Sequence, residues 1–166
     1  MKRNQAREIA VLLGFSVIAT GEDPQKTVDD FFRPEHYATL AAEDELFAGT
    51  PSKKTAEYIR RSVVGVAEHA QELDDYITKY AAGWRAERIS RSAAAVLRQA
   101  MFEILYMPDI PAAVSINEAV EIAKNYEDDN LVVFINGILG SFVRDLKQSE
   151  AAETAGEESA ETPAEE

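Results

Sequence analysis

The residues that most often carry catalysis or bind metals are few in this sequence, and their spacing matches no such site. The chain has no cysteine and only two histidines, His36 and His69, which lie at no recognisable ligand spacing. We expect both on the surfaces of helices. Asp128, Asp129 and Asn130 resemble part of a calcium loop, but the glycine and the distant glutamate of that loop are missing. These three residues are therefore interpreted as a helix cap.

No enzyme motif takes the place of such a site. Gly137 and Gly140 lie within a helical pattern that no strand precedes, which excludes a phosphate-binding turn and favours close helix packing. Neither a G-x-S-x-G sequence nor a Walker sequence is present. We therefore expect a protein that is not an enzyme and that uses no cofactor and no metal.

Composition and hydropathy limit the number of domains and the location. A chain of 166 residues with 46% hydrophobic content has the size of one domain with a real core. The absence of cysteine fits a reducing compartment. No apolar run approaches the ~18 residues of a membrane span, and the start of the chain lacks a signal-peptide cleavage site. The sequence therefore predicts a soluble, cytoplasmic protein with no membrane partner.

The formal net charge of −13 argues against a broad nucleic-acid surface. From Lys147 onward the chain has seven glutamates and one lysine, which leaves 23 acidic and 16 basic residues before that point. Any nucleic-acid site would thus be a local basic patch on an acidic body. Residues 149–166 contain no aromatic or large aliphatic side chain, so we expect a disordered Glu-rich tail after one domain at 1–148.

Periodicity before the tail predicts an all-α fold, because no stretch alternates with period two. A helix over 3–19 ends at Gly21, and a short helix begins at the Asp23-Pro24 cap. A third covers about 37–47, and Thr50-Pro51 starts a long stretch, straight or bent, that runs to 82. Later helices are predicted over 92–106, 115–126 and from Asp128 to 146. Within 115–126, Ser115 and Glu118 have the spacing of a capping box.

Six short stretches form a combination that is more specific than any one of them. They are R-x-x-A-R-E-x-A-V from Arg3, W-x-x-E-R-I from Trp84, V-L-R-Q-A-M-F-E-I-L from Val96, D-I-P from Asp109, I-N-E-A-V-E-I-A-K-N-Y from Ile116 and F-I-N-G-I-L from Phe134. In this order, over about residues 3–146, they resemble the NusB family of bacterial transcription antitermination factors.

The resemblance implies a fold of about seven helices in two packed helical bundles and a role that is not enzymatic. It implies pairing with the ribosomal protein that acts as NusE and binding of the single-stranded boxA element of nascent RNA. The pair would join an RNA polymerase antitermination complex, chiefly on ribosomal RNA operons.

The resemblance also implies which residues contact RNA, since single strands are bound by cations and by aromatic faces on which bases stack. The matching positions are Lys2, Arg3, Arg7, Phe15, Tyr80 and Phe134. Asn4, Gln5 and Val133 stand where some relatives have basic residues, which predicts weaker attraction for phosphates.

Each assignment has an ordinary structural alternative. Arg3 and Arg7 are also what a solvated helix face would carry, Phe15 and Phe134 lie on apolar stripes typical of a core, and the ring of Tyr80 is also suited to burial. The competing hypothesis for the whole chain is a helical protein-interaction module or homodimer with no direct contact to RNA.

Overall fold

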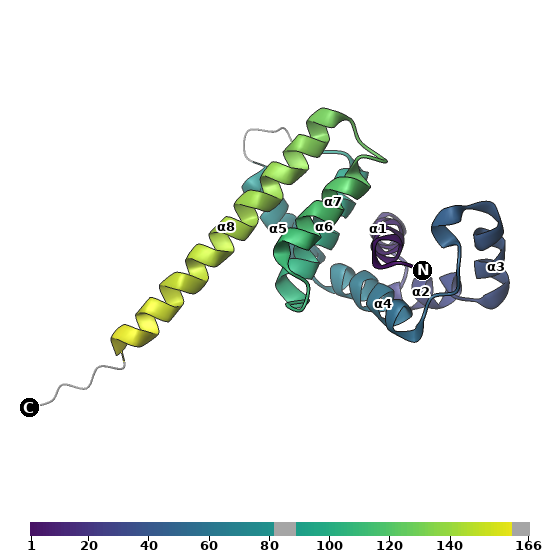
Figure 1. The fold of residues 1–166 in the computed structure, drawn as a ribbon, viewed down its shortest axis with the longest axis horizontal. Coiled ribbons are helices and arrows are strands. Elements are labelled where there is room, and N and C mark those ends of the chain that lie inside the picture. Colours follow the sequence, from purple (N-terminus) through teal and green to yellow (C-terminus); the bar gives the residue numbers. More distant parts are fainter. Residues whose placement is uncertain (82–88, 161–166) are drawn as a thin grey trace, which may run out of the picture.

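The computed structural model describes residues 1–81 and 89–160, and every regular element in these ranges is a helix (Figure 1). The all-α prediction is confirmed. Part of the W-x-x-E-R-I motif and the helix end predicted at Gly83 lie outside the described residues. The elements are α1 (Arg3–Thr20), α2 (Pro24–Phe31), α3 (Pro34–Glu43), the 3-10 helix η1 (Glu45–Phe47), α4 (Lys53–Glu68), α5 (Ala70–Tyr80), α6 (Arg91–Tyr106), α7 (Ala112–Ala123) and α8 (Asp129–Ala160).

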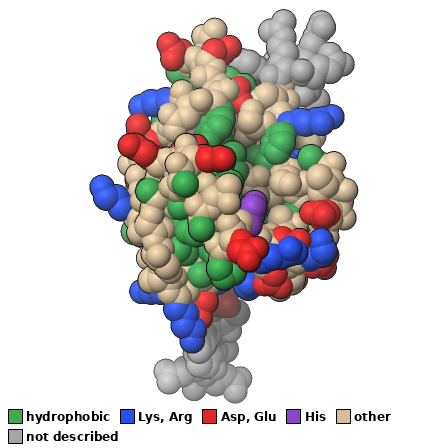
Figure 2. Space-filling view, turned by 90° about the vertical axis from the view of Figure 1, so that its right-hand side faces the viewer, with side chains coloured by type: hydrophobic (Ala, Val, Ile, Leu, Met, Phe, Trp, Pro, Cys, Tyr) green, Lys and Arg blue, Asp and Glu red, His purple; other side chains and the backbone are tan. Residues whose placement is uncertain are grey.

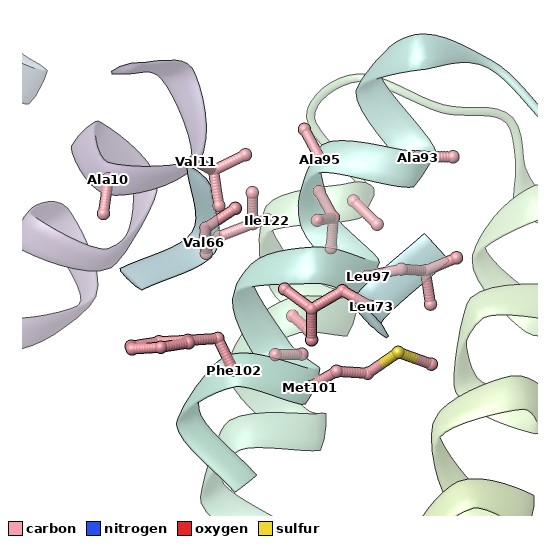
Figure 3. Close-up of a cluster of buried hydrophobic side chains, with 14 of the residues drawn as sticks. Ala10, Val11, Val66, Leu73, Ala93, Ala95, Leu97, Met101, Phe102 and Ile122 are labelled. Atoms are coloured by element: carbon pink, nitrogen blue, oxygen red, sulfur yellow. The ribbon is translucent and has the colours of Figure 1, made fainter. Parts of the chain in front are cut away.

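The helices form two bundles that share one hydrophobic core. In the N-terminal bundle α1 packs against α4 and α2, and in the C-terminal bundle α6 packs against α5, α7 and α8. Contacts of α6 with α1 and α4 join the two. Figure 3 shows this junction, where Val11 of α1, Val66 of α4 and Ile122 of α7 lie together beside α6.

Local capping chemistry predicted three helix boundaries correctly. Gly21 ends α1 in the left-handed region at φ 71°, which glycine adopts without a steric penalty. The Asp23 carboxylate accepts a hydrogen bond of 2.8 Å from the backbone of Lys26 at the start of α2. Asp128 accepts one of 2.9 Å from the backbone of Leu131 at the start of α8.

Two other boundaries differ from the sequence prediction. The cap of α4 is Ser52 rather than Thr50, and the long stretch breaks at His69, which ends α4 and precedes α5. Helix α7 begins at Ala112, so Ser115 lies inside it and is fully buried. The predicted capping box is therefore wrong. The Ser115 hydroxyl instead donates a hydrogen bond of 2.7 Å to Glu103 in the core.

Close helix packing at a glycine does occur, but at a different glycine from those predicted. A Cβ atom added to Gly137 or Gly140 would meet nothing within 4 Å, so the predicted packing role of these residues is wrong. A Cβ atom at Gly65 of α4 would lie 2.1 Å from the ring of Phe102 in α6. Gly65 therefore lets α6 place an aromatic ring directly on the backbone of α4.

Helix α8 runs to Ala160 and projects well beyond the rest of the molecule (Figure 1). Residues 147–159 are all exposed and pack on nothing. The structure therefore differs from the disorder predicted for 149–160, because alanine and glutamate favour helix even where no partner stabilises it. Residues 161–166 lie outside the described ranges. None of the described helices is long and apolar enough to span a membrane.

Candidate nucleic-acid interface

The first two predicted contacts, Lys2 and Arg3, lie at the start of α1 and are exposed. The Arg3 guanidinium lies over the ring of Tyr58 in α4, with its carbon 4.2 Å from the ring centroid. Such a cation–π contact contributes about 0.5–1 kcal/mol at an exposed site. It holds the charge of Arg3 against α4 while its N–H groups stay available, since the structure gives Arg3 no ion pair with a described residue.

Arg3 opens onto a pocket of about 440 Å³ between the start of α1, helix α4 and the connection from α6 to α7. Lys54 and Arg61 of α4 line the same pocket, together with the carboxylates of Glu57 and Asp109. The sequence did not indicate Lys54 or Arg61, because they lie about fifty residues from Arg3 and only the packing of α1 on α4 brings them together. In this pocket Arg3 is therefore accompanied by two further positive and two negative side chains.

Arg7, one helical turn after Arg3, is in the core rather than at the surface. Its side chain is 3% exposed, and its Nε donates a hydrogen bond of 2.8 Å to the fully buried carboxylate of Glu103. Burial disfavours its charge, but the hydrogen bond and the charge of Glu103 outweigh that and raise the pKa of Arg7. The prediction of an RNA contact at Arg7 is thus corrected to an internal ion pair between α1 and α6.

Glu103 is the centre of a buried polar network that the sequence motifs did not reveal. Besides Arg7, its carboxylate accepts hydrogen bonds from the hydroxyls of Tyr58 and Ser115, so it joins α1, α4, α6 and α7. Burial, followed by the charge of Glu103, raises the pKa of Tyr58. The available signal was a glutamate within the apolar stretch V-L-R-Q-A-M-F-E-I-L, since a charge on a buried helix face requires partners.

Phe15 is exposed, at 37%, but it lies away from the pocket beside Arg3. Twelve residues separate Phe15 from Arg3, which corresponds to about 18 Å along α1. Phe15 and Ile18 line a second pocket of about 360 Å³ together with Arg91 and Arg98. An aromatic ring and arginines therefore occur together here too.

Tyr80 at the end of α5 is half-buried. Its hydroxyl donates a hydrogen bond of 2.8 Å to Asp145 of α8, and its ring packs edge-on against Phe142. Burial and then the bond to Asp145 raise the pKa of Tyr80 to about 12. The Lys79 ammonium lies 5.2 Å from the ring centroid. Tyr80 thus ties α5 to α8 and presents a ring that a cation already approaches.

Phe134 lies in the hydrophobic core and is 8% exposed. The predicted role as a stacking platform is corrected to core packing, because the inward stripe of α8 carries this residue. The neighbouring Val133 points the other way and is 71% exposed. The alternative of a core residue, left open for Phe134 by its position on an apolar stripe, is the one that the structure selects.

The six predicted residues therefore do not form one compact site. Arg3 shares a pocket with two cations of α4, and Lys2 is its exposed neighbour in the chain, whereas Phe15 and Tyr80 do not line that pocket. Figure 2 shows one face of the molecule on which basic and acidic side chains are interspersed, with no broad basic field. In the described part of the chain no group of three His, Asp or Glu residues is placed to hold a metal ion.

Comparison with known proteins identifies relatives that match nearly the whole chain. The model of the NusB family matches residues 4–144. A protein of Symbiobacterium thermophilum named transcription antitermination protein NusB is 36% identical over 155 residues, which are 93% of this chain and 97% of the relative. The Bacillus subtilis protein of the same name is 34% identical over 90% of this chain and its own full length.

Solved structures show the same fold. The structure of T. maritima NusB superposes with a TM-score of 0.70 at 30% identity and covers 87% of this chain and 92% of its own. The NusB chain in a structure of antitermination factors NusB and NusE in complex with dsRNA gives a TM-score of 0.65 over 86% of this chain and 96% of its own. At 22% identity, that second likeness concerns the fold alone.

Proposed function

The chain belongs to the NusB family, and from this premise we propose that it is a transcription antitermination factor. With the ribosomal protein that acts as NusE, it binds boxA RNA of nascent transcripts, notably of ribosomal RNA operons. The pair then promotes processive transcription within an RNA polymerase complex in the cytoplasm. The role is to bind and assemble rather than to catalyse a reaction.

The observation that carries this proposal is the match to the family over residues 4–144, which runs from the first turn of α1 to the middle of α8. Relatives of 34–36% identity are named for transcription antitermination. A structure of the same fold contains NusB and NusE with double-stranded RNA. The matched range also supports residues 1–148 as the RNA-binding domain, with the Glu-rich segment from 149 as an appendage.

Within this domain we assign phosphate contacts to Lys2 and Arg3, whose charges face solvent at the start of α1. Phe15 and Tyr80 remain the candidates for base stacking, because Phe15 is exposed and Tyr80 is half-buried at the end of its helix. Stacking contributes about 1–3 kcal/mol per base. Arg7 and Phe134 support the site from the core.

A second candidate function, a protein-interaction module or homodimer without RNA, is favoured by exposed apolar side chains. These are Phe15, Ile18, Val114, Tyr126 and Val133. Light scattering over a range of concentrations separates the two candidates when combined with RNA binding. A mass that doubles with concentration while RNA binding is absent supports the second candidate and contradicts the first.

The test of the RNA contacts uses Arg3→Gln and the double variant with Lys2→Gln, each in the presence of the NusE partner. We expect both to weaken binding of boxA RNA in fluorescence anisotropy and to reduce its salt dependence, by about 0.7 in the slope of log K against log salt for each phosphate that is no longer neutralised. The matched control is Arg33→Gln, since Arg33 is also exposed but pairs with Asp30 at the far end of α2. Unchanged affinity in both variants would overturn the assignment of these cations.

A further inference from the structure

We propose that the pocket lined by Arg3, Lys54 and Arg61 is a phosphate subsite that carries the RNA strand from the start of α1 along the surface of α4. This inference rests on the proposed function, and it adds two residues of α4 that no sequence motif indicates. The ligand is a phosphodiester of the single-stranded RNA that the pair with NusE binds.

The three cations form a row because of their register. Lys54, Tyr58 and Arg61 are spaced at i, i+4 and i+7, so they lie on one face of α4 over about 10.5 Å of its length. Arg3 lies over the ring of Tyr58, between the two ends of this row. The geometry therefore places three positive groups in a line along a helix, which is the arrangement that an extended phosphate backbone requires.

The charges in this row have few internal partners. The Lys54 side chain forms no hydrogen bond and no ion pair within the described ranges, although those of several other exposed cations do, including Lys26 and Arg60. Arg61 donates one N–H to the carbonyl of Tyr106 and retains other donors of its guanidinium. Helix formation does not explain Lys54 either, because it lies in the first turn of α4, where a cation opposes the helix dipole.

Two carboxylates lower the net positive charge of the pocket, so it does not attract every polyanion equally. Glu57 and Asp109 line it but form no ion pair with its three cations. These five groups together carry one net positive charge, whereas the formal net charge of the whole chain is −13. Such a pocket favours a ligand that brings hydrogen-bond donors with its phosphate, as the 2′-hydroxyl of RNA does, over a bare anion. We therefore expect each α4 cation to contribute one phosphate contact rather than a diffuse attraction.

The experiment compares Lys54→Gln and Arg61→Gln with the unaltered full chain, each with the NusE partner and a boxA-type single-stranded RNA, over a range of salt concentrations. Removing one phosphate contact should lower the magnitude of the slope of log K against log salt by about 0.7. Lys26→Gln is the matched control, because Lys26 is exposed on α2 and already paired with Asp30. It should leave the slope unchanged.

The outcomes separate this subsite from the function on which it rests. If the unaltered pair binds boxA RNA and Arg3→Gln weakens it, but both α4 variants keep the original affinity and slope, the subsite is refuted and the function stands. If the unaltered pair does not bind boxA RNA, both are overturned. Far-ultraviolet circular dichroism checks the fold of Arg61→Gln. Lys54→Gln removes no internal contact and therefore decides the matter if Arg61→Gln unfolds.

Discussion

At the scale of single residues, Arg3 and Arg7 show how one turn of helix divides two like charges between surface and core. Arg3 rests on the ring of Tyr58, and Arg7 is buried against Glu103. The two are connected, because the Tyr58 hydroxyl also donates to Glu103. The buried network thus fixes the ring that supports the exposed arginine, which gives Arg7 an indirect part in the interface.

The internal ion pair makes a prediction for stability. Arg7→Ala leaves the carboxylate of Glu103 buried without its cation, so we expect the free energy of unfolding to fall by about 3–5 kcal/mol in urea denaturation. The control Lys124→Ala, which removes an exposed cation paired with Glu121, should change it by less than about 0.5 kcal/mol. A stable Arg7→Ala protein that has lost only RNA binding would show that Arg7 acts at the surface after all.

The sequence could identify the N-terminal cations as a group, but it could not show which of them are exposed and which are buried. The shared motif does not indicate that Ala6, Arg7 and Ala10 lie on the inward face of α1. The deciding partner, Glu103, is 96 residues away. The sequence likewise gave no reason to assign Lys54 and Arg61 to the site, because no local feature distinguishes them from other exposed cations. Site residues set by long-range packing required the structure.

At the scale of helices too, the boundaries set by local capping could be predicted from the sequence, whereas those set by long-range packing could not. The end of α1 and the starts of α2 and α8 follow from Gly21, Asp23 and Asp128, whose capping bonds lie within a few residues. The capping box predicted at Ser115 was wrong. Its spacing to Glu118 suits a cap, but its hydroxyl donates a hydrogen bond to Glu103 in another helix. The close approach of α4 and α6 at Gly65 had no local signature either.

That close approach gives a matched pair of glycine variants. Gly65→Ala would drive a Cβ atom into the ring of Phe102, so we expect a loss of about 1–3 kcal/mol in the free energy of unfolding. Gly137→Ala places the same methyl group in open space within α8 and should add about 0.5–1 kcal/mol by restricting the unfolded chain. Equal changes in the two variants, measured by urea denaturation, would show that α4 and α6 are not packed as described.

At the scale of the whole molecule, an acidic protein that binds RNA must do so through a small area. The Glu-rich end of α8 projects away from the two bundles, which separates its four glutamates from the cations on α1 and α4 (Figure 1). The all-α fold was predictable because apolar periodicity covers nearly the whole chain, and the two bundles were predictable because the ordered motifs resemble the NusB family. The extension of α8 was not, because composition alone does not decide between an exposed helix and disorder.

The central claim, that this chain binds boxA RNA together with NusE, is tested most directly by a gel shift with boxA RNA and a scrambled RNA of equal composition. Each RNA is titrated with the chain, with the NusE partner and with the pair, at two salt concentrations. We predict that the pair binds boxA RNA selectively and more tightly than either protein alone, and that higher salt weakens binding. A pair that forms but binds boxA and scrambled RNA equally, or neither of them, would contradict the account.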